Sequence, residues 1–474
     1  MPASGVVPVT LGWLATTVGG RIISGSPARP VGNLTTDTRA LQPGDFFVAL
    51  RGPRFDGNAF VEQALEKGAG GALVDGGFDR RPDLDARQEA PALVQVDDTL
   101  LALQQLAHAV RQGSGTRVVA ITGSAGKTTT KETIAELLGT RFRVVKNKGN
   151  LNNHIGLPVS LMQLRDRPDV AVMELGMNHA GEISTLVAIA EPDVRVWINV
   201  GDAHLGFFAS ADAIADAKAE ILERADASTV LVCNADDALV MARVTKFPGR
   251  VVTFGAAPHA TVRAVEIEDR GVNGMRARVA TPAGEREFET PLLGRGNLAN
   301  VLAATAVALE FKVALDVIVD IARRLTPAAH RGAVHRLNSG VTLIDDSYNS
   351  SPTALRRALE VVAREPGATR KVAVLGEMLE LGDVSVPLHE ECGRAAAEAG
   401  LRLLFAVGGP PARALADAAI RAGMPAGDVT YVENSDQAAW RVASALGAGD
   451  LVLVKGSRGI RTDLVVDRIV AELA

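Results

Sequence analysis

The sequence predicts an α/β fold with three domains, and three observations support this prediction. The chain has 474 residues, which is more than a single hydrophobic core usually supports. From Arg117 onward, short apolar runs alternate with helical segments, which is typical of a parallel sheet covered by helices. A second series of this kind starts near residue 328, so a Rossmann-like domain is expected to close the chain.

The first expected domain comprises residues 1–113 and mixes short strands with helices. The apolar run 46–50 predicts a strand, and helical patterns cover 59–67 and 101–110. Residues 111–115, Arg-Gln-Gly-Ser-Gly, are expected to form a linker to the next domain because glycine and serine interrupt regular structure.

The second expected domain comprises residues 114–327. Residues 261–293 interrupt its alternation of strands and helices with one pair of strands around a glycine turn. Its other strands are expected over 118–120, 143–145, 170–173, 194–198 and 230–232, and its helices over 131–138, 210–224 and 298–309.

The third expected domain, residues 328–474, repeats the alternation of strands and helices. Ligands are expected in crevices between the domains, because open parallel sheets bind them at the carboxyl ends of the strands. The strands of this domain are expected over 341–344, 372–375, 403–407, 429–432 and 451–454.

The composition, with 47% hydrophobic and 22% charged residues, is that of a globular enzyme and excludes a disordered chain. A net charge of −5 without a long basic run argues against nucleic acid as a partner. The two cysteines, Cys233 and Cys392, are far apart, which fits a reducing compartment. The first 20 residues lack a basic start and no apolar run is long enough to span a membrane, so we expect a cytoplasmic protein. A monomer is also expected.

The most informative segment is residues 121–130, Ile-Thr-Gly-Ser-Ala-Gly-Lys-Thr-Thr-Thr, which separates an apolar strand from a helix. Such a turn directs backbone N–H groups at an anion, Lys127 adds a positive charge, and the Thr128 hydroxyl can reach Mg²⁺. The usual P-loop has another glycine where this chain has Ile121, so the match is to a shorter variant. An ordinary strand-to-helix turn is the alternative, but the preceding strand and the following threonines favour nucleotide binding. The expected contacts are Gly123, Ser124, Ala125, Gly126, Lys127, Thr128 and Thr129.

Two side chains after apolar strands are candidate metal ligands. Glu174 ends the run 170–173, where a carboxylate beside a phosphate-binding loop is placed to bind Mg²⁺ or to orient water, although a solvated strand-end acid would look the same. His204 lies in the loop after the strand 194–198, and a single loop histidine is only a weak indication of a site.

Lys218 lies in phase with the apolar side of the expected helix over 210–224. A lysine that faces a core is costly unless it is paired, modified or in contact with a ligand. The alternative is a side chain whose stem follows the edge of the apolar stripe and keeps its ammonium in water.

Several loops carry polar side chains that suit ligands. Residues 147–158 are rich in asparagine, including Asn152 and Asn153, whose amides bind phosphates and peptides but also stabilise turns. In the helix expected after residue 296, Asn297 could be no more than an N-cap, whereas Asn300 lies one turn further and could face an adenine.

In the third domain, polar residues follow two strands, where this fold places ligands. Residues 345–349, Asp-Asp-Ser-Tyr-Asn, include Tyr348, one of two tyrosines in the chain. Residues 455–458, Lys-Gly-Ser-Arg, place two positive charges around a glycine, which suits a carboxylate or a phosphate. Either segment alone could be a plain loop, but their presence in one domain favours a site.

Taken together, these motifs resemble the Mur ligase family, the ATP-dependent amide-forming enzymes of peptidoglycan precursor synthesis. The resemblance covers essentially the whole chain, with the motifs in family order. It is greatest to the member that adds D-alanyl-D-alanine to UDP-N-acetylmuramoyl-tripeptide, and the Asp-Asn-Pro-Arg motif of the member that adds a diamino acid or lysine is absent. The segments that carry this likeness are 150–158, 345–352 and 375–382.

The resemblance implies a role for each matching position. Lys127 and Thr128 would hold the ATP phosphates and Mg²⁺, and Glu174, His204 and Lys218 match metal-site positions, with Lys218 expected to be carbamylated. The positions that match nucleotide contacts are Asn300, Arg331, Asp346 and Asn349. The expected substrate-binding residues are Thr36, Asp37, Thr38 and Arg39 for UDP, and Asn152, Asn153, Tyr348, Lys455, Ser457 and Arg458 elsewhere.

Three positions depart from the family pattern, and none belongs to the expected metal site. Arg331 follows Ala-His where the family commonly has Pro-Gly, Glu377 replaces a more usual aspartate, and His154 replaces an acid.

The family mechanism is phosphorylation of the tripeptide carboxylate by ATP, followed by attack of the D-alanyl-D-alanine amine on the acyl phosphate. Two alternatives remain at this point: another ligase of the superfamily, such as a folylpolyglutamate synthetase, or a protein that uses ATP as a switch. The segments around residues 345 and 375 argue against the first. The second would need neither a strand-end acid nor a core-facing lysine.

Overall fold

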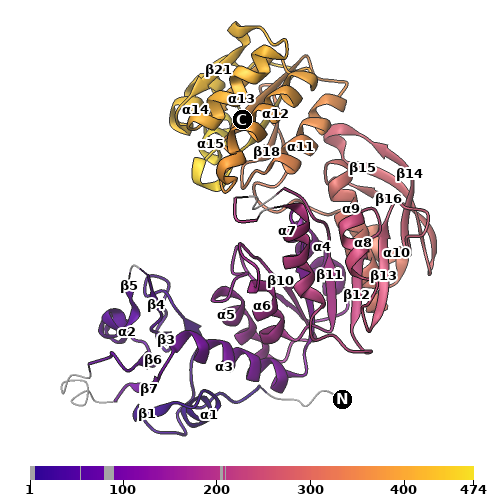
Figure 1. Ribbon diagram of the computed structural model, residues 1–474. Helices are drawn as coiled ribbons and strands as arrows, with labels where there is room; N and C mark the ends of the chain where they lie inside the picture. The colour runs from indigo at the N-terminus through magenta and orange to yellow at the C-terminus, as the bar shows by residue number, and fades with distance from the viewer. Residues whose placement is uncertain (1–5, 54, 80–89, 203–205, 209) are drawn as a thin grey trace. The chain divides into compact units, whose positions relative to one another are not determined.

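The computed structural model describes residues 6–53, 55–79, 90–202, 206–208 and 210–474 (Figure 1). Two compact units make up this part of the chain. The first contains residues up to 120, 141–177 and 181–194, and the second contains 121–140, 178–180 and 195–474. Both units combine helices with parallel strand pairs, which confirms the predicted α/β class.

A five-stranded sheet in the order β1-β7-β6-β3-β2 forms part of the first unit. Its strands are parallel except β1, which runs antiparallel to β7. Apolar side chains of the sheet pack against α2 (Val61–Glu66), which follows a 3-10 turn and confirms the expected helix. The strands are β1 (Arg21–Ser24), β2 (Leu34–Thr35), β3 (Phe46–Val48), β6 (Gly71–Asp75) and β7 (Ala92–Val96), and α1 spans Leu11–Thr17.

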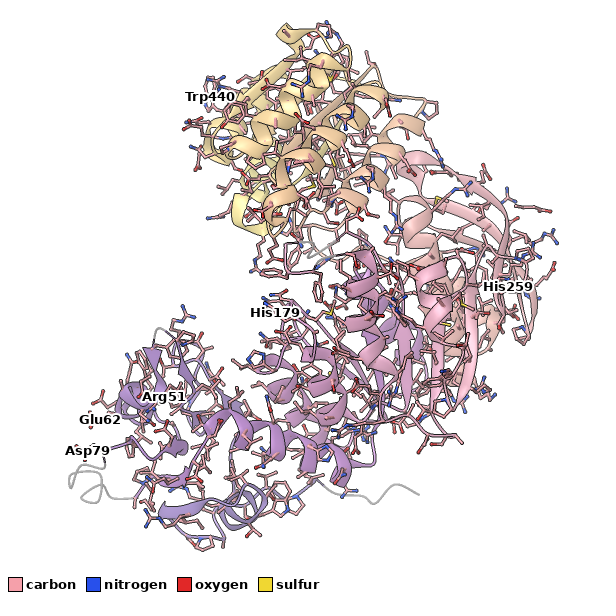
Figure 2. The ribbon with its side chains drawn as sticks, viewed as in Figure 1. Arg51, Glu62, Asp79, His179, His259 and Trp440 are labelled. Atoms are coloured by element: carbon pink, nitrogen blue, oxygen red, sulfur yellow. The ribbon has the colours of Figure 1, made fainter. Side chains whose placement is uncertain are left out.

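A two-stranded ribbon, β4 (Arg51–Gly52) and β5 (Phe55–Asp56), follows β3. Arg51, labelled in Figure 2, donates to the Asp56 carboxylate across this ribbon at 2.9 Å.

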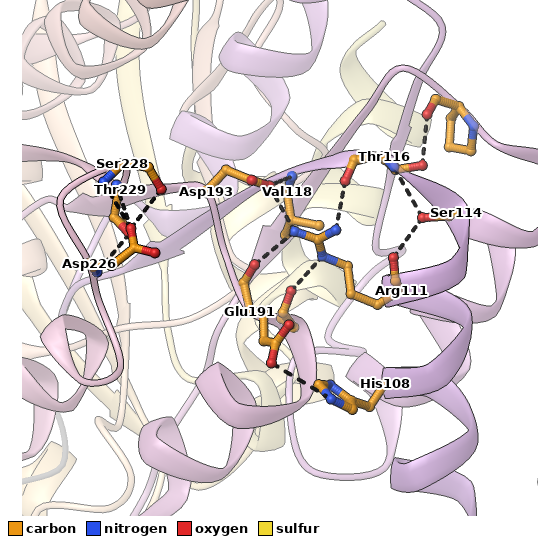
Figure 3. A network of polar contacts seen from close by, with 12 residues as sticks. His108, Arg111, Ser114, Thr116, Val118, Glu191, Asp193, Asp226, Ser228 and Thr229 are labelled. Carbon is orange, nitrogen blue, oxygen red and sulfur yellow. Dashed lines mark hydrogen bonds and ion pairs between the residues drawn. The ribbon is translucent and has the colours of Figure 1, made fainter. Parts of the chain in front are cut away.

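The expected linker at residues 111–115 is wrong, because α3 (Thr99–Ser114) continues through it and ends at Gly115, which has a φ of 69°. In the last turn of this helix, the Arg111 guanidinium donates to the carbonyls of Thr116, Ala190 and Glu191 and to the Asp193 carboxylate (Figure 3). Glycine and serine therefore mark a helix terminus here rather than a flexible connection.

The strands expected over 118–120, 143–145, 170–173, 194–198 and 230–232 are all confirmed within a nine-stranded sheet. In the first unit, β9 (Val144–Lys146) and β10 (Val170–Glu174) are parallel, and most of β8 (Arg117–Thr122) also belongs there. The helices of this part are α5 (Gly156–Leu161) and α6 (Glu182–Ala190).

In the second unit, the corresponding strands follow the order β11-β12-β13-β14-β15-β16. β12, β13 and β14 are parallel, and β15 and β16 continue the sheet in antiparallel pairs. These strands are β11 (Val194–Trp197), β12 (Val230–Asn234), β13 (Arg250–Gly255), β14 (Val262–Asp269), β15 (Met275–Thr281) and β16 (Gly284–Thr290). The helices are α4 (Lys127–Gly139), α7 (Ala211–Ala219), α8 (Ala238–Arg243), α9 (Gly294–Glu310) and α10 (Leu315–Ala322).

The segment 261–293 forms three strands, β14, β15 and β16, so the prediction of a single pair of strands is wrong. The solvent-facing positions carry cross-strand ion pairs, such as Arg278 with Glu266 on β14 and with Glu285 on β16. The alternate positions, including Ala277 and Phe288, are buried. Because charged residues fill one face, the apolar content of β16 is too low for a simple hydrophobic pattern to mark it as a strand.

The third sheet has six strands in the order β17-β18-β22-β19-β20-β21. All are parallel except β17, and successive side chains of β19 alternate between two cores, with Ala373 in one and Val372 in the other. The strands are β17 (Ala333–Arg336), β18 (Thr342–Asp346), β19 (Arg370–Gly376), β20 (Leu403–Val407), β21 (Val429–Val432) and β22 (Asp450–Lys455).

Helices cover both faces of this sheet, as a Rossmann-like domain requires (Figure 1). One face packs against α11 (Pro352–Arg364), α12 (Ser385–Glu398) and α13 (Pro410–Arg421), and the other against α14 (Ser435–Ala445) and α15 (Asp463–Leu473). Among the described residues, no helix combines the length and the apolarity needed to cross a bilayer.

Candidate active site

The loop between β8 and α4 has the form of an anion-binding turn. Gly126 has a φ of 88° and precedes the first residue of α4, so the backbone N–H groups at the start of this helix are not used within it. A Cβ atom at Gly126 would lie 2.5 Å from Oδ1 of Asn300. Both the backbone conformation and the space therefore require glycine here.

Asn199, just beyond β11, holds this loop in place. Its Oδ1 accepts from the backbone N–H groups of Ser124 and Ala125 at 3.0 Å each, and its Nδ2 donates to the Ala125 carbonyl at 2.9 Å. The Ser124 hydroxyl also donates to the Gly201 carbonyl and accepts from the Gly201 N–H. Asn199 is absent from the predicted site, although its position at a strand end was a signal that could have identified it.

Lys127 and Lys218 are electrostatically coupled. Lys127 Nζ donates to the Gly123 carbonyl at 2.7 Å, so its charge lies against the loop. Lys218 is only 1% exposed, which confirms that it faces the core. Burial, and then the positive charge of Lys127, place the pKa of Lys218 well below its ordinary value. A larger fraction of this amine is therefore neutral near pH 7 than for an exposed lysine.

Glu174, at the end of β10 in the first unit, is 4% exposed and held by asparagine side chains. Asn152 Nδ2 donates to Glu174 Oε1 at 2.8 Å. Asn147, which is not among the predicted site residues, accepts from the Glu174 N–H and donates to its carbonyl. Asn153 binds backbone groups: its Oδ1 accepts from the N–H groups of Ile155 and Gly156 at the start of α5.

The other expected metal-site residues are only partly described. Thr128 and Thr129 lie in the first turn of α4. His204 lies outside the described residues. Within the residues that are described, no three histidine, cysteine, aspartate or glutamate side chains cluster as a metal site.

Asn297 lies inside α9, which rules out the alternative that it is only an N-cap. Its Nδ2 donates to the carbonyl of Leu293, the residue that precedes the helix, and its Oδ1 accepts from Asn300 at 3.1 Å. This second bond orients the buried Asn300 amide beside Gly126.

The expected ligand residues of the third sheet lie at the carboxyl ends of β18 and β22. Lys455 Nζ is buried and donates to Asp346 Oδ2 at 2.6 Å and to the Asn349 carbonyl at 2.9 Å. The Tyr348 ring has the Arg331 guanidinium 4.1 Å from its centre, and Arg458 donates to its hydroxyl at 3.2 Å.

Ser457, between these basic residues, is buried and accepts from the Leu379 N–H at 2.9 Å. The structure therefore joins the loop after β22 to the loop after β19.

The four residues expected to bind UDP form a turn in the first unit. The Arg39 guanidinium and its N–H donate to the Asp37 carboxylate, and these hydrogen bonds lower the pKa of Asp37 to about 2. Thr38 donates to Gln63, whereas the neighbouring Thr36 is half-buried. Arg39 remains largely exposed.

Three family models match successive parts of the chain. Their descriptions are "Mur ligase family, catalytic domain" for residues 30–111, "Mur ligase middle domain" for 121–308, and "Mur ligase, glutamate ligase domain" for 330–458. Whole-chain relatives agree with them: UDP-N-acetylmuramoyl-tripeptide–D-alanyl-D-alanine ligase of Bacillus subtilis is 35% identical over 95% of this chain and 96% of its own. This chain belongs to the Mur ligase family.

Other comparisons place the chain within this family. The Escherichia coli enzyme of the same name is 38% identical over 79% of this chain and 81% of its own. A crystal structure of MurF from Acinetobacter baumannii has a TM-score of 0.86 at 31% identity, covering 98% of this Mur ligase and 99% of that chain. MurF from Thermotoga maritima, solved in complex with ADP, has a TM-score of 0.80 at 28% identity, covering 93% and 98%. The predicted three-domain α/β architecture is therefore confirmed.

Proposed function

We propose that this Mur ligase joins D-alanyl-D-alanine to UDP-N-acetylmuramoyl-tripeptide and uses ATP to activate the tripeptide carboxylate. The match to the Bacillus subtilis ligase of that name, over 95% of the chain, carries the proposal. The predicted family segments are consistent with it, because residues 345–349 and 455–458 lie at the ends of adjacent strands.

The proposed reaction proceeds in two steps. A carboxylate oxygen of the tripeptide attacks the γ-phosphorus of ATP, ADP leaves, and an acyl phosphate remains. The neutral amine of D-alanyl-D-alanine then attacks the carbonyl carbon, the intermediate loses inorganic phosphate, and the nitrogen releases a proton. Positive charge and N–H groups directed at the transferring phosphoryl group lower the barrier of the first step.

The phosphate-binding loop would supply those groups. The N-terminus of α4 and Lys127 would contact the phosphates, with the loop residues 123–129 around them. Asn199 would keep the N–H groups of the loop oriented. Asn300 would do the same for Gly126, against which its side-chain amide lies. We also assign Arg331, Asp346 and Asn349 to the nucleotide.

Mg²⁺ would be held by Thr128, Glu174, His204 and a carbamate on Lys218, and it would offset negative charge on the phosphates. Two observations on these residues fit a Mg²⁺ ion held partly by a carbamate. Glu174 is buried and oriented by Asn152, and oxygen ligands suit Mg²⁺. Carbamylation requires a neutral amine, and the pKa of Lys218 is lowered by its surroundings.

The remaining assignments follow the family resemblance. Residues 36–39 would contact the UDP group, whose phosphates suit the exposed Arg39. The peptide substrates would contact Asn152, Asn153, Tyr348, Lys455, Ser457 and Arg458. We propose domain boundaries after residues 113 and 327, supported by family matches over 30–111, 121–308 and 330–458. A cytoplasmic monomer is also proposed, and its free, buried cysteines suit a reducing compartment.

Phosphate release from ATP tests the function when Mg²⁺, UDP-N-acetylmuramoyl-tripeptide and D-alanyl-D-alanine are omitted in turn. We expect release only with all components, together with a pentapeptide product identified by its mass. Phosphate release with a different amine would assign the chain to a different member of the family. ATP turnover that is independent of both substrates would instead favour the switch hypothesis.

Replacing Gly126 with alanine is expected to weaken ATP binding about 10-fold or more, because the new Cβ has no space beside Asn300 and the φ of 88° is unfavourable for alanine. Titration with a fluorescent ATP analogue measures this change. Gly139→Ala is the matched control, because it lies at the other end of α4 with no atom within 4 Å of the added carbon. Equal affinities for the two variants would contradict the role of Gly126.

A further inference from the structure

His389 on α12 is wholly buried and makes hydrogen bonds through both ring nitrogens. Nδ1 lies 2.7 Å from the Ser385 carbonyl oxygen, which can only accept. Nε2 lies 2.9 Å from the Met378 backbone nitrogen, which can only donate. The ring must therefore be neutral, with its proton on Nδ1.

Met378 belongs to the loop 376–382, which begins at the last residue of β19. The residues on either side of Met378 connect this loop to neighbouring strand ends: the Glu377 N–H donates to the Val407 carbonyl, and the Leu379 N–H donates to Ser457 Oγ. The Ser457 N–H in turn donates to the Glu377 carbonyl. The His389 contact thus lies at the centre of a segment that supports residues 455–458.

A charged imidazole would break this arrangement, because protonated Nε2 would direct its own N–H at the Met378 N–H. Burial lowers the pKa of His389, while the Ser385 carbonyl and the Glu377 carboxylate oppose that effect. Two arginines on the helices beside α12 pair with acids on the surface of α12 rather than with His389: Arg356 of α11 pairs with Glu391, and Arg421 of α13 pairs with Glu390.

We propose that neutral His389 is a positioning residue, which fixes the loop 376–382 through the Met378 N–H and thereby holds Ser457 and Arg458 in place for substrate. The effect on substrate rests on the proposed function. The effect on the loop does not, because it follows from the hydrogen bonds alone.

Two substitutions distinguish the contributions of the two ring nitrogens of His389. His389→Gln places an amide oxygen near the position of Nε2 and keeps an acceptor for Met378, whereas His389→Asn keeps a donor near Nδ1 and removes that acceptor. We expect backbone amides of residues 376–382 in the full-length Asn variant to exchange hydrogen for deuterium about 10-fold faster than in the wild type. Exchange in the Gln variant should stay close to the wild type.

Kinetics with the same variants test the effect on substrate. The Asn variant should show a KM for D-alanyl-D-alanine or tripeptide about 10-fold higher with little change in kcat, and the Gln variant should restore the wild-type KM. Equal loop exchange in both variants would overturn the proposal. If exchange changes in the Asn variant but the wild type itself does not ligate D-alanyl-D-alanine, the loop assignment stands and the proposed function is refuted.

A titration of the wild type covers the case in which neither variant folds. Because burial lowers the pKa of His389, loop exchange corrected for its intrinsic pH dependence should increase only at a pH below the ordinary histidine range, before exchange of β20 (Leu403–Val407) in the same sheet increases. Loop exchange that increases with acidity only together with exchange of β20 would overturn the proposal.

Discussion

Replacing Lys127 with alanine is expected to lower the rate of ligation by about 10²–10³-fold or more. The Lys127 ammonium lies against the Gly123 carbonyl at the start of the proposed phosphate-binding loop, so the substitution removes a positive charge from that loop. Phosphate release and pentapeptide formation with saturating substrates measure the loss. Lys246→Ala is a suitable control, because Lys246 is an exposed lysine of the same unit.

The same variant has a second expected effect, on Lys218. The charge of Lys127 contributes to the lowered pKa of Lys218, so its removal should raise that pKa and leave less neutral amine to react with CO₂. Near-normal turnover by a folded Lys127→Ala protein would refute the assignment of this loop to ATP phosphates.

Replacing Lys218 with methionine is expected to lower activity by a similar factor, because the proposed carbamate ligand for Mg²⁺ could not form. Methionine has a long side chain without an amine, so it fills the buried space and tests chemistry rather than packing. Ligation rates should be measured after removal of CO₂ and again after addition of bicarbonate. The wild type should lose and regain activity, whereas the variant should respond to neither change.

A direct observation of the modification accompanies these rates. Protein incubated with ¹³C-bicarbonate should show a carbamate carbon signal by NMR that is absent from Lys218→Met. Lys131 is a useful contrast, because it is equally buried but pairs with Glu132 at 3.3 Å and needs no modification to offset its charge. A wild-type ligation rate that does not depend on CO₂, together with the absence of a carbamate signal, would exclude the carbamate.

Much of the fold could be predicted because its signals are local. The alternation of apolar runs and helices predicts the sheets, and the phase of Lys218 along one helix predicts its burial. The strands β14 to β16 show where such signals weaken, because an ion-paired face lowers the hydrophobic content of β16. The predicted linker is wrong because α3 continues to Ser114, and its last turn makes a contact that no local pattern shows, between Arg111 and Asp193, 82 residues further along the chain.

The sequence by itself determined the class of the fold and the family and predicted the phosphate-binding loop, because each depends on residue types at short, fixed spacings. Only the tertiary structure showed what holds those segments in place. Asn199 supports a loop 75 residues before it, and His389 fixes a loop on a different element. A hydrogen bond between distant residues depends on how the chain packs, and no local pattern in a single sequence records which two residues packing will bring together.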